Sequence, residues 1–477
     1  MSTHVVATFH ETILYRHADL IYRAVMNSRT VIACWSCILL HCSIAAAQMN
    51  ALDSTRLDYT LKTTVEAYNK VGRQDAKWDS DARVALDAFA RMHSVTNGST
   101  AEYFKELDKA LRKLSAEGCD DPFIRYLFLR FVYSDSHSSA ENAKEFVEVA
   151  KTLQGSQYPE IRKFFATYWA HKTLAGAEPK RAEVRLLLQE ASSHLAAALT
   201  DKSMPLVEAD QAVDQLMSAS FWSSPGRWET YHALEPSLTN RWADSCMAWL
   251  MKGRGYLSFA WQARGIGYAN TVSDQGWKLM TERLDIAAKA LEKAWKLDPT
   301  DTRVCQEMMR VELGQNKGRE RMELWFQRGM KLDPSDYDLC YEKIEYLRPR
   351  WYGSIEEMIQ FGRECGTNTN WRGRVPLWRA LVYDEVLREL PRDGRNGFWT
   401  RPSVWSDVRA AFERFFQLNP DQVSWRHNYA RYAFQCEQWQ EFLKQTQMFP
   451  WTNHAYFGGA EQFNQMVKSA QEHVNKK

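Results

Sequence analysis

The triplet Leu297-Asp298-Pro299 returns as Leu332-Asp333-Pro334, 35 positions later, and each copy closes a predicted amphipathic helix. A looser copy, Leu418-Asn419-Pro420, ends a third such helix. A recurrence of about 34 residues that ends on a proline is the pattern of helix–turn–helix units stacked into a solenoid. The triplet therefore predicts an all-α fold, an α-α superhelix of helical hairpins.

The residues before the two prolines resemble the second helix of a tetratricopeptide (TPR) unit. Phe326 and Gly329 stand where that pattern expects an aromatic and a small residue, and Ala287 and Ala294 take the two small positions of the earlier copy. The first helix of each unit fits the pattern poorly. The sequence predicts a TPR-like helical-hairpin solenoid built from divergent copies.

Outside the repeat, apolar residues recur every three or four positions and no stretch alternates with the period of a strand. The turn-forming run at 223–226 is the best internal boundary. Ser335 and Ser354 each have an acidic residue three positions later, Asp338 and Glu357, and we predict that each serine caps the start of a helix. We predict four segments: an upstream extension with a signal peptide at 1–47, an N-terminal helical array at 48–222, Trp-rich connecting helices at 223–275, and the TPR-like repeat region at 276–477.

The N-terminal region predicts export. From Met26 the chain has a basic start, then an apolar run of about 15 residues at 30–44, then Ala45-Ala46-Ala47, the three parts of a secretory signal. The run is shorter than the roughly 20 apolar residues that span a bilayer. We therefore expect cleavage after Ala47, a periplasmic or extracellular protein, and no membrane span in the mature chain.

The charge and the aromatic content of the chain limit the classes of partner that it is expected to bind. A formal charge of +2 gives no general attraction to nucleic acid or to a membrane surface. Tryptophan is abundant, with 19 residues, and most of them follow residue 221. Abundant aromatic side chains and a nearly neutral charge favour a protein or peptide as the partner.

The cysteines leave two alternatives open. After the predicted leader six remain, widely scattered and without a Cys-x-x-Cys pair, a spacing that does not favour a zinc site. Cys340 and Cys365 would lie on consecutive helices and form a disulfide in an oxidising compartment. The alternative is that all six are small buried thiols in helix cores.

Two aromatic and arginine-rich segments are the candidate binding residues. The first contains Trp261 and Arg264, and the second is the turn Arg350-Trp351-Tyr352, with Trp371 further along. Arginine and aromatic side chains together stack on and hydrogen-bond a peptide or a sugar. The structural alternative is that Trp351 fills a groove between helices and Arg350 caps a helix C-terminus.

Several motifs resemble those of exported bacterial TPR-like proteins, a largely uncharacterised group. The resemblance covers about 240–420, and it is weaker around 118–122. It implies an all-helical repeat fold and brings no assigned reaction. The motifs that carry it are Ala260-Trp261-Gln262-Ala263-Arg264-Gly265, Trp277, Met322-Glu323-Leu324-Trp325-Phe326, Pro349-Arg350-Trp351-Tyr352-Gly353-Ser354, Phe361-Gly362-Arg363-Glu364-Cys365 and Asn370-Trp371.

No motif supplies a reaction centre. The sequence has no Gly-x-Ser-x-Gly nucleophile turn and no correctly spaced phosphate loop, so we assign no catalytic, cofactor-binding or metal-binding residue. We expect an exported, non-catalytic scaffold for a protein or peptide partner. One alternative is an all-helical glycan-binding or glycan-processing toroid, for which Asp244, Asp274 and Asp407 are the candidate carboxylates. The other is a purely structural protein.

Overall fold

The computed structural model describes residues 54–95, 100–133, 139–179, 181–219, 227–449 and 451–476. These residues form helices joined by turns, and no strand occurs among them. The predicted all-α fold is confirmed. The predicted signal peptide at 1–47 lies outside the described residues.

The chain divides into two compact units, the first ending at Phe259 and the second beginning at Ala260. The border falls inside one long helix, α12 (Cys246–Arg264). The predicted borders at 222/223 and 275/276 stay predictions, and residues 220–226 beside the first lie outside the described ranges.

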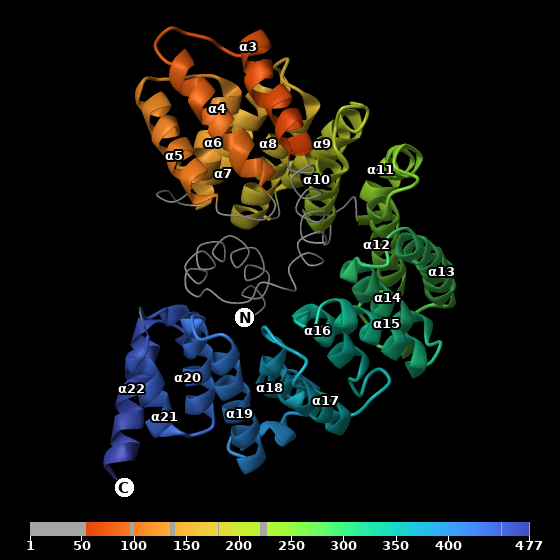
Figure 1. The fold of residues 1–477 in the computed structure, drawn as a ribbon, viewed down its shortest axis with the longest axis vertical. Helices are drawn as coiled ribbons and strands as arrows, with labels where there is room; N and C mark the ends of the chain where they lie inside the picture. The colour runs from red at the N-terminus through yellow and green to blue at the C-terminus, as the bar shows by residue number, and fades with distance from the viewer. Residues whose placement is uncertain are drawn as a thin grey trace, which may run out of the picture. The chain divides into compact units, whose positions relative to one another are not determined.

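In the N-terminal unit most consecutive helices pack against each other (Figure 1). A helix at 54–61 continues through a π-helical turn into the rest of the unit. The elements that follow are η1 (Lys62–Glu66), α3 (Ala67–Val71), α4 (Asp79–Ser94), α5 (Ala101–Ala116), α6 (Pro122–Phe131), α7 (Ser139–Gln154), α8 (Glu160–Ala177), α9 (Ala182–Ala198), α10 (Leu206–Ala219), α11 (Arg227–Arg241) and most of α12.

A buried charge network crosses the core of this unit. Glu208 on α10 is fully buried and accepts hydrogen bonds from Arg56 Nε at 3.0 Å and from Arg162 Nη2 at 3.5 Å. His93 Nε2 lies 3.0 Å from the same carboxylate. Arg162 also donates to Thr63 Oγ1 at 2.8 Å. The partners come from four helical segments, so the network ties the unit together through its centre.

The C-terminal unit continues the same architecture. Its elements are η4 (Ala269–Thr271), α13 (Asp274–Leu297), α14 (Thr302–Gln315), α15 (Arg319–Leu332), α16 (Tyr337–Tyr346), α17 (Ile355–Thr367), η5 (Val375–Leu377), α18 (Trp378–Glu389), η6 (Asp393–Arg395), α19 (Pro402–Leu418), η7 (Val423–Trp425), α20 (Arg426–Gln435), α21 (Trp439–Gln447), η8 (His454–Phe457) and α22 (Ala460–Asn475). Consecutive helices of this unit pack side by side, as is usual when short loops reverse the direction of the chain between them (Figure 1).

The two Leu-Asp-Pro copies have the same local structure. Leu297 ends α13 and Leu332 ends α15, and the following aspartates are extended, as the residue before a proline prefers. Asp298 Oδ1 accepts from the backbone N–H and the hydroxyl of Thr300, at 2.9 and 2.6 Å. Asp333 Oδ1 accepts in the same way from Ser335, at 2.8 and 2.6 Å. The repeat is thus present at the level of single hydrogen bonds.

The third copy closes its helix differently. Leu418 ends α19, and Asn419 uses its side-chain amide to donate to the carbonyls of Gly373 and Phe415, both at 3.0 Å. An asparagine supplies donors that an aspartate lacks. This copy therefore ties its helix end to the loop between α17 and η5 instead of forming an aspartate turn.

One of the two predicted caps is correct. Ser354 Oγ accepts from the N–H of Glu357 at 3.2 Å and caps α17. The prediction of Ser335 as the next cap is wrong, because Asp336 caps α16 by accepting from the N–H of Leu339 at 2.9 Å. Ser335 is already engaged in the turn made by Asp333.

The predicted small positions lie where helices approach closely. Ala287, Ala294 and Gly329 are buried in their helices. A Cβ on Gly329 would meet Cys305 Cβ of α14 at 3.2 Å and a methyl of Leu339 of α16 at 2.4 Å. A larger residue here would force these helices apart, which explains the small residue of the repeat pattern.

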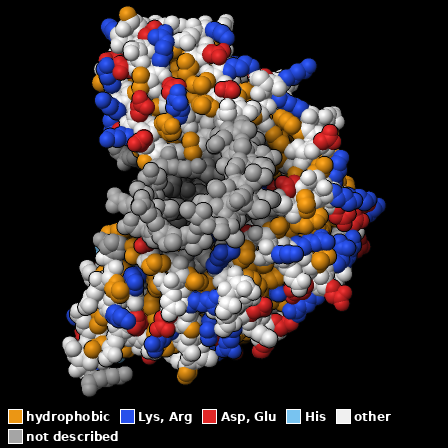
Figure 2. Space-filling view, viewed as in Figure 1, with side chains coloured by type: hydrophobic (Ala, Val, Ile, Leu, Met, Phe, Trp, Pro, Cys, Tyr) orange, Lys and Arg blue, Asp and Glu red, His pale blue; other side chains and the backbone are white. Residues whose placement is uncertain are grey.

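The surface carries both charge signs. Figure 2 shows basic and acidic side chains interspersed over the visible face of each unit, in keeping with the charge of +2. Among the described residues, no helix combines the length and the apolar character that crossing a membrane requires.

Candidate functional site

Three indole rings surround one guanidinium at the start of the C-terminal unit. The Arg264 Cζ atom lies 5.2 Å from the ring centroid of Trp351, 5.7 Å from that of Trp277 and 5.8 Å from that of Trp261. The Trp261 and Trp351 rings meet edge to face at 5.6 Å. All three distances are within the range of cation–π attraction. We call these four residues the Arg264 cluster.

Helix ends and one turn position the Arg264 cluster. Trp261 and Arg264 are three positions apart at the end of α12, so they lie on one helix face. Trp277 lies in the first turn of α13, which Ser273 caps by accepting from the N–H of Gly276 at 3.1 Å. Trp351 belongs to the turn between α16 and α17, where its N–H donates to the carbonyl of Arg348 at 2.8 Å.

The loop after Arg264 exposes apolar side chains. Arg264 Nη1 donates to the carbonyls of Gly265 at 3.2 Å and Gly267 at 3.0 Å, and Gly265 has a positive φ of 73°. Between and after these glycines, Ile266 is 94% exposed and Tyr268 is 81% exposed. The guanidinium thus holds a loop that presents two large apolar side chains to solvent beside the indole rings.

The structure brings together some of the predicted site residues and separates others. Trp261, Arg264 and Trp351 are in contact, and Tyr352 is at the edge of the cluster, its ring 6.4 Å from that of Trp351. The Tyr352 hydroxyl donates inward to the carbonyl of Leu313 at 3.0 Å.

The other two predicted residues have structural surroundings. Arg350 is half exposed and lies 3.5 Å from a Glu345 oxygen and 3.7 Å from a Glu389 oxygen. Trp371 is only 8% exposed and packs edge-on against Phe326 and Phe361. Trp371 is therefore a core residue in this fold.

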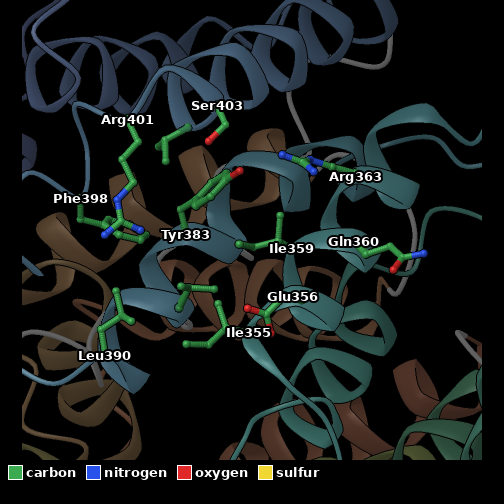
Figure 3. Close-up of a pocket in the computed structure, with 12 residues that line it drawn as sticks. Ile355, Glu356, Ile359, Gln360, Arg363, Tyr383, Leu390, Phe398, Arg401 and Ser403 are labelled. Atoms are coloured by element: carbon green, nitrogen blue, oxygen red, sulfur yellow. The ribbon is translucent and has the colours of Figure 1, made fainter. Parts of the chain in front are cut away.

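A second feature was missed by sequence reasoning: a cavity of about 410 Å³ among α17, α18, α19 and the loop before α19. Figure 3 shows Tyr383 near its centre, Arg363 and Arg401 on opposite sides of that ring, and Glu356 beside Ile355. The lining is half apolar and half polar, and consists of Ile355, Glu356, Ile359, Gln360, Arg363, Tyr383, Val386, Leu390, Phe398, Arg401, Ser403 and Val404.

A buried carboxylate fixes one wall of the cavity. Asp407 on α19 is 3% exposed and accepts from Arg363 Nε and Arg379 Nε, both at 2.8 Å, and from the Tyr383 hydroxyl at 2.6 Å. Burial raises the pKa of Asp407, but these three hydrogen bonds outweigh it and hold the pKa below its usual value. Burial and the contact with Asp407 raise the pKa of Tyr383, so its hydroxyl stays a donor.

The Asp407 network bears on the glycan-processing alternative. All three donors that converge on Asp407 come from its own unit, so the carboxylate is committed to packing α17, α18 and α19 together. Asp274 is an exposed first-turn residue of α13, and Asp244 lies in the N-terminal unit. The glycan alternative stays a prediction, without support from Asp407.

Arg401 and Glu356 lack charged partners in the described part of the chain. Arg401 stacks near Phe398, its Cζ 5.1 Å from the ring centroid, and its one hydrogen bond there is to the Gly394 carbonyl at 3.4 Å. Glu356 is an exposed first-turn residue of α17. The sequence indicated these groups only weakly, as an arginine-rich loop at 392–401 and as an acidic helix start.

The cysteines are free thiols in the described residues, and most of them are buried. Cys340 on α16 and Cys365 on α17 are both fully buried, and Cys340 Sγ lies 3.8 Å from Met330 Sδ. Burial raises the pKa of Cys365, so the thiol is protonated at neutral pH. No group of three metal-ligating His, Cys, Asp or Glu side chains occurs within the described ranges.

No protein-family model matches the chain, and no curated protein matches it either. The Arg264 cluster and the cavity are therefore the features from which a function can be inferred.

Proposed function

We propose that this chain is an exported, non-catalytic helical-repeat protein of the TPR-like kind that acts as a scaffold for a protein or peptide partner. The observation that carries the proposal is the loop at 265–268. Its Ile266 and Tyr268 are almost fully solvent-exposed beside the Arg264 cluster. Large apolar side chains in water are stabilised when a partner covers them.

The composition of this surface suits a protein interface. Interface centres are enriched in tryptophan, tyrosine and arginine, and these anchors carry most of the binding free energy. The Arg264 cluster supplies three tryptophans and one arginine, and Trp277 is 37% exposed. Because Arg264 and the indole rings already hold one another, little side-chain freedom would be lost on binding.

Two experiments test this proposal. The first is capture of partners from the exported fraction by the full chain, compared with an Ile266→Asp, Tyr268→Asp double variant. We expect the variant to lose the captured protein, because charged side chains cannot be buried in an apolar contact. The matched control is Leu186→Asp on α9, which is 51% exposed in the N-terminal unit. Equal capture by all three proteins would contradict the proposal.

The second experiment tests export directly. N-terminal sequencing of the chain recovered from outside the cytoplasm should begin at Gln48, after removal of residues 1–47. A chain that stays inside the cell with an intact N-terminus would contradict export and leave the binding surface to be tested separately.

A further inference from the structure

The cavity among α17, α18 and α19 is a different site from the Arg264 cluster. Its volume of about 410 Å³ is at the small end of the range for ligand pockets, about 300–1,000 Å³. It therefore suits one amino-acid residue or a ligand of similar size. Its lining residues do not include any member of the Arg264 cluster or of the loop at 265–268.

The apolar part of the cavity selects the kind of side chain it takes. Phe398 and Val404 are 2% exposed and Val386 is 1% exposed, so these three form a wall that is already packed. In front of it, the half-buried Ile359 and Ile355 from α17 and Leu390 just after α18 present the apolar surface that a ligand can contact. An aliphatic side chain placed there would leave water, with a gain of about 25 cal/mol per Å² of apolar surface.

The charged groups facing the cavity are Glu356, Arg363 and Arg401. Arg363 is matched by Asp407 through its Nε. Arg401 forms no ion pair with an acidic side chain in the described ranges, and Glu356 forms none with a basic one. The cavity thus offers one unmatched cation and one unmatched anion on either side of an apolar wall (Figure 3).

We propose that this cavity binds the C-terminal residue of a peptide, with its carboxylate on Arg401 and its aliphatic side chain against Ile355, Ile359 and Leu390. A planar guanidinium pairs with a carboxylate through two parallel hydrogen bonds. Glu356 and Gln360 then face the peptide backbone, where an amide N–H is the donor that a carboxylate accepts. A plain fatty acid has no such N–H, so the lining favours a peptide.

This inference goes beyond the proposed function, because it assigns a ligand class to a separate site. The test uses short fluorescein-labelled peptides that differ only in their last residue, each made with a free C-terminal carboxylate and as the amide. Fluorescence anisotropy with the full chain gives the affinities. We expect peptides ending in leucine, isoleucine or valine to bind, and amidation to weaken binding about tenfold to a hundredfold.

Variants locate the contact. Arg401→Gln should weaken binding of the free-acid peptide to the affinity of the amidated peptide, and should leave binding of the amidated peptide unchanged. Arg392→Gln, an exposed arginine of the same loop that does not line the cavity, should bind like the natural chain. Ile359→Ala should weaken the binding of both peptides together, and circular dichroism checks that each variant is folded.

Several outcomes would overturn the inference. Equal affinities for the free-acid and the amidated peptide would show that the carboxylate makes no contact. An unchanged affinity of the Arg401→Gln variant for the free-acid peptide would show that the carboxylate binds elsewhere. An amidated peptide with an internal glutamate that binds as tightly as the free acid would assign the site to a side-chain carboxylate. Displacement of the peptide by octanoate at equal affinity would assign it to an aliphatic acid. Loss of capture by the Ile266 and Tyr268 variant would affect none of these results.

Discussion

Each unit contains a buried carboxylate with several partners, but the two networks differ in what lies beside them. Glu208 in the N-terminal unit is fully buried, and so is Arg162, while Arg56 is 7% exposed. Asp407 in the C-terminal unit is equally well bonded, yet the side chain of Arg363 is 49% exposed and lines a cavity.

The comparison separates two uses of charge. When the partners of a charge are mostly buried, as around Glu208, where the His93 side chain is the most exposed at 15%, the network chiefly holds helices together. When one partner also faces a cavity, the same chemistry fixes a wall on which a ligand can bind. On this criterion the N-terminal unit is structural at its centre, and both binding sites proposed above lie in the C-terminal unit.

The largest expected effect is at the Glu208 network in the core of the N-terminal unit. Glu208→Gln keeps the shape of the side chain and leaves Arg56 and Arg162 without a buried counter-charge. We expect a loss of about 3–5 kcal/mol in the free energy of unfolding of the N-terminal unit, because uncompensated buried charge is strongly destabilising. Urea unfolding followed by circular dichroism measures it. Glu178→Gln, whose ion pair with Arg181 is exposed, is the control and should change little.

The Asp407 network, which lies beside the cavity, should tolerate the corresponding loss of its carboxylate better. Asp407→Asn removes the negative charge and one of the two acceptor oxygens that Arg363 and Arg379 share, but Arg363 is half exposed and regains water. We expect a loss of about 1–3 kcal/mol, measured in the same way. A larger loss than that of Glu208→Gln would contradict the distinction between the two networks.

The two networks should also lose stability in different pH ranges. Burial lowers the pKa of His93 below its ordinary value of 6.5, against the opposing effect of Glu208. As pH falls through 6.5, the unfolded chain gains a proton that the folded chain does not, so stability is lost from there downward. The pKa of Asp407 is lowered below 3.8, so its contribution is present above 3.8 and is lost only as pH falls further.

Unfolding curves recorded between pH 7 and pH 3 check this difference. His93→Gln should reduce the loss of stability that begins near pH 6.5, and Asp407→Asn should leave that part unchanged. His171 is also buried with a lowered pKa, so some slope will remain in the His93 variant. An identical slope in the natural chain and in His93→Gln would show that His93 is not responsible.

The smallest effect is expected at a residue that the sequence had singled out. Arg350→Ala removes a half-exposed ion pair with Glu345 and Glu389, and exposed pairs contribute about 0–1 kcal/mol. We expect unchanged partner capture, since Arg350 is not part of the Arg264 cluster. A clear drop in capture would return Arg350 to the binding surface.

Local signals in the sequence predicted what depends on local structure. The Leu-Asp-Pro triplets placed the ends of α13 and α15 correctly, because a proline acts on the residue before it. The choice of Ser335 as a helix cap failed, because Asp333 engages that hydroxyl and Asp336 has the better position. Two neighbouring polar residues compete for the same role, and the spacing alone does not decide between them.

Contacts between distant segments were only partly predictable. Arg264 and Trp351 were chosen for their residue types, and the fold places them together across 87 positions. Trp371 was chosen for the same reason and lies in the core. The Asp407 network joins α17, α18 and α19, and no local pattern marks Arg363 and Arg379 as its partners. Such contacts depend on how successive hairpins pack, which residue spacing does not encode.

Hydrogen–deuterium exchange on the full chain tests the central claim most directly. With an excess of the leucine-ended free-acid peptide, we predict slower exchange in α17 and in the loop at 390–401, and unchanged exchange in α8 and α10. The amidated peptide serves as the control and should give weaker protection. Protection in α8 and α10, or no protection in the C-terminal unit, would contradict the proposal that the peptide binds in the cavity beside Asp407.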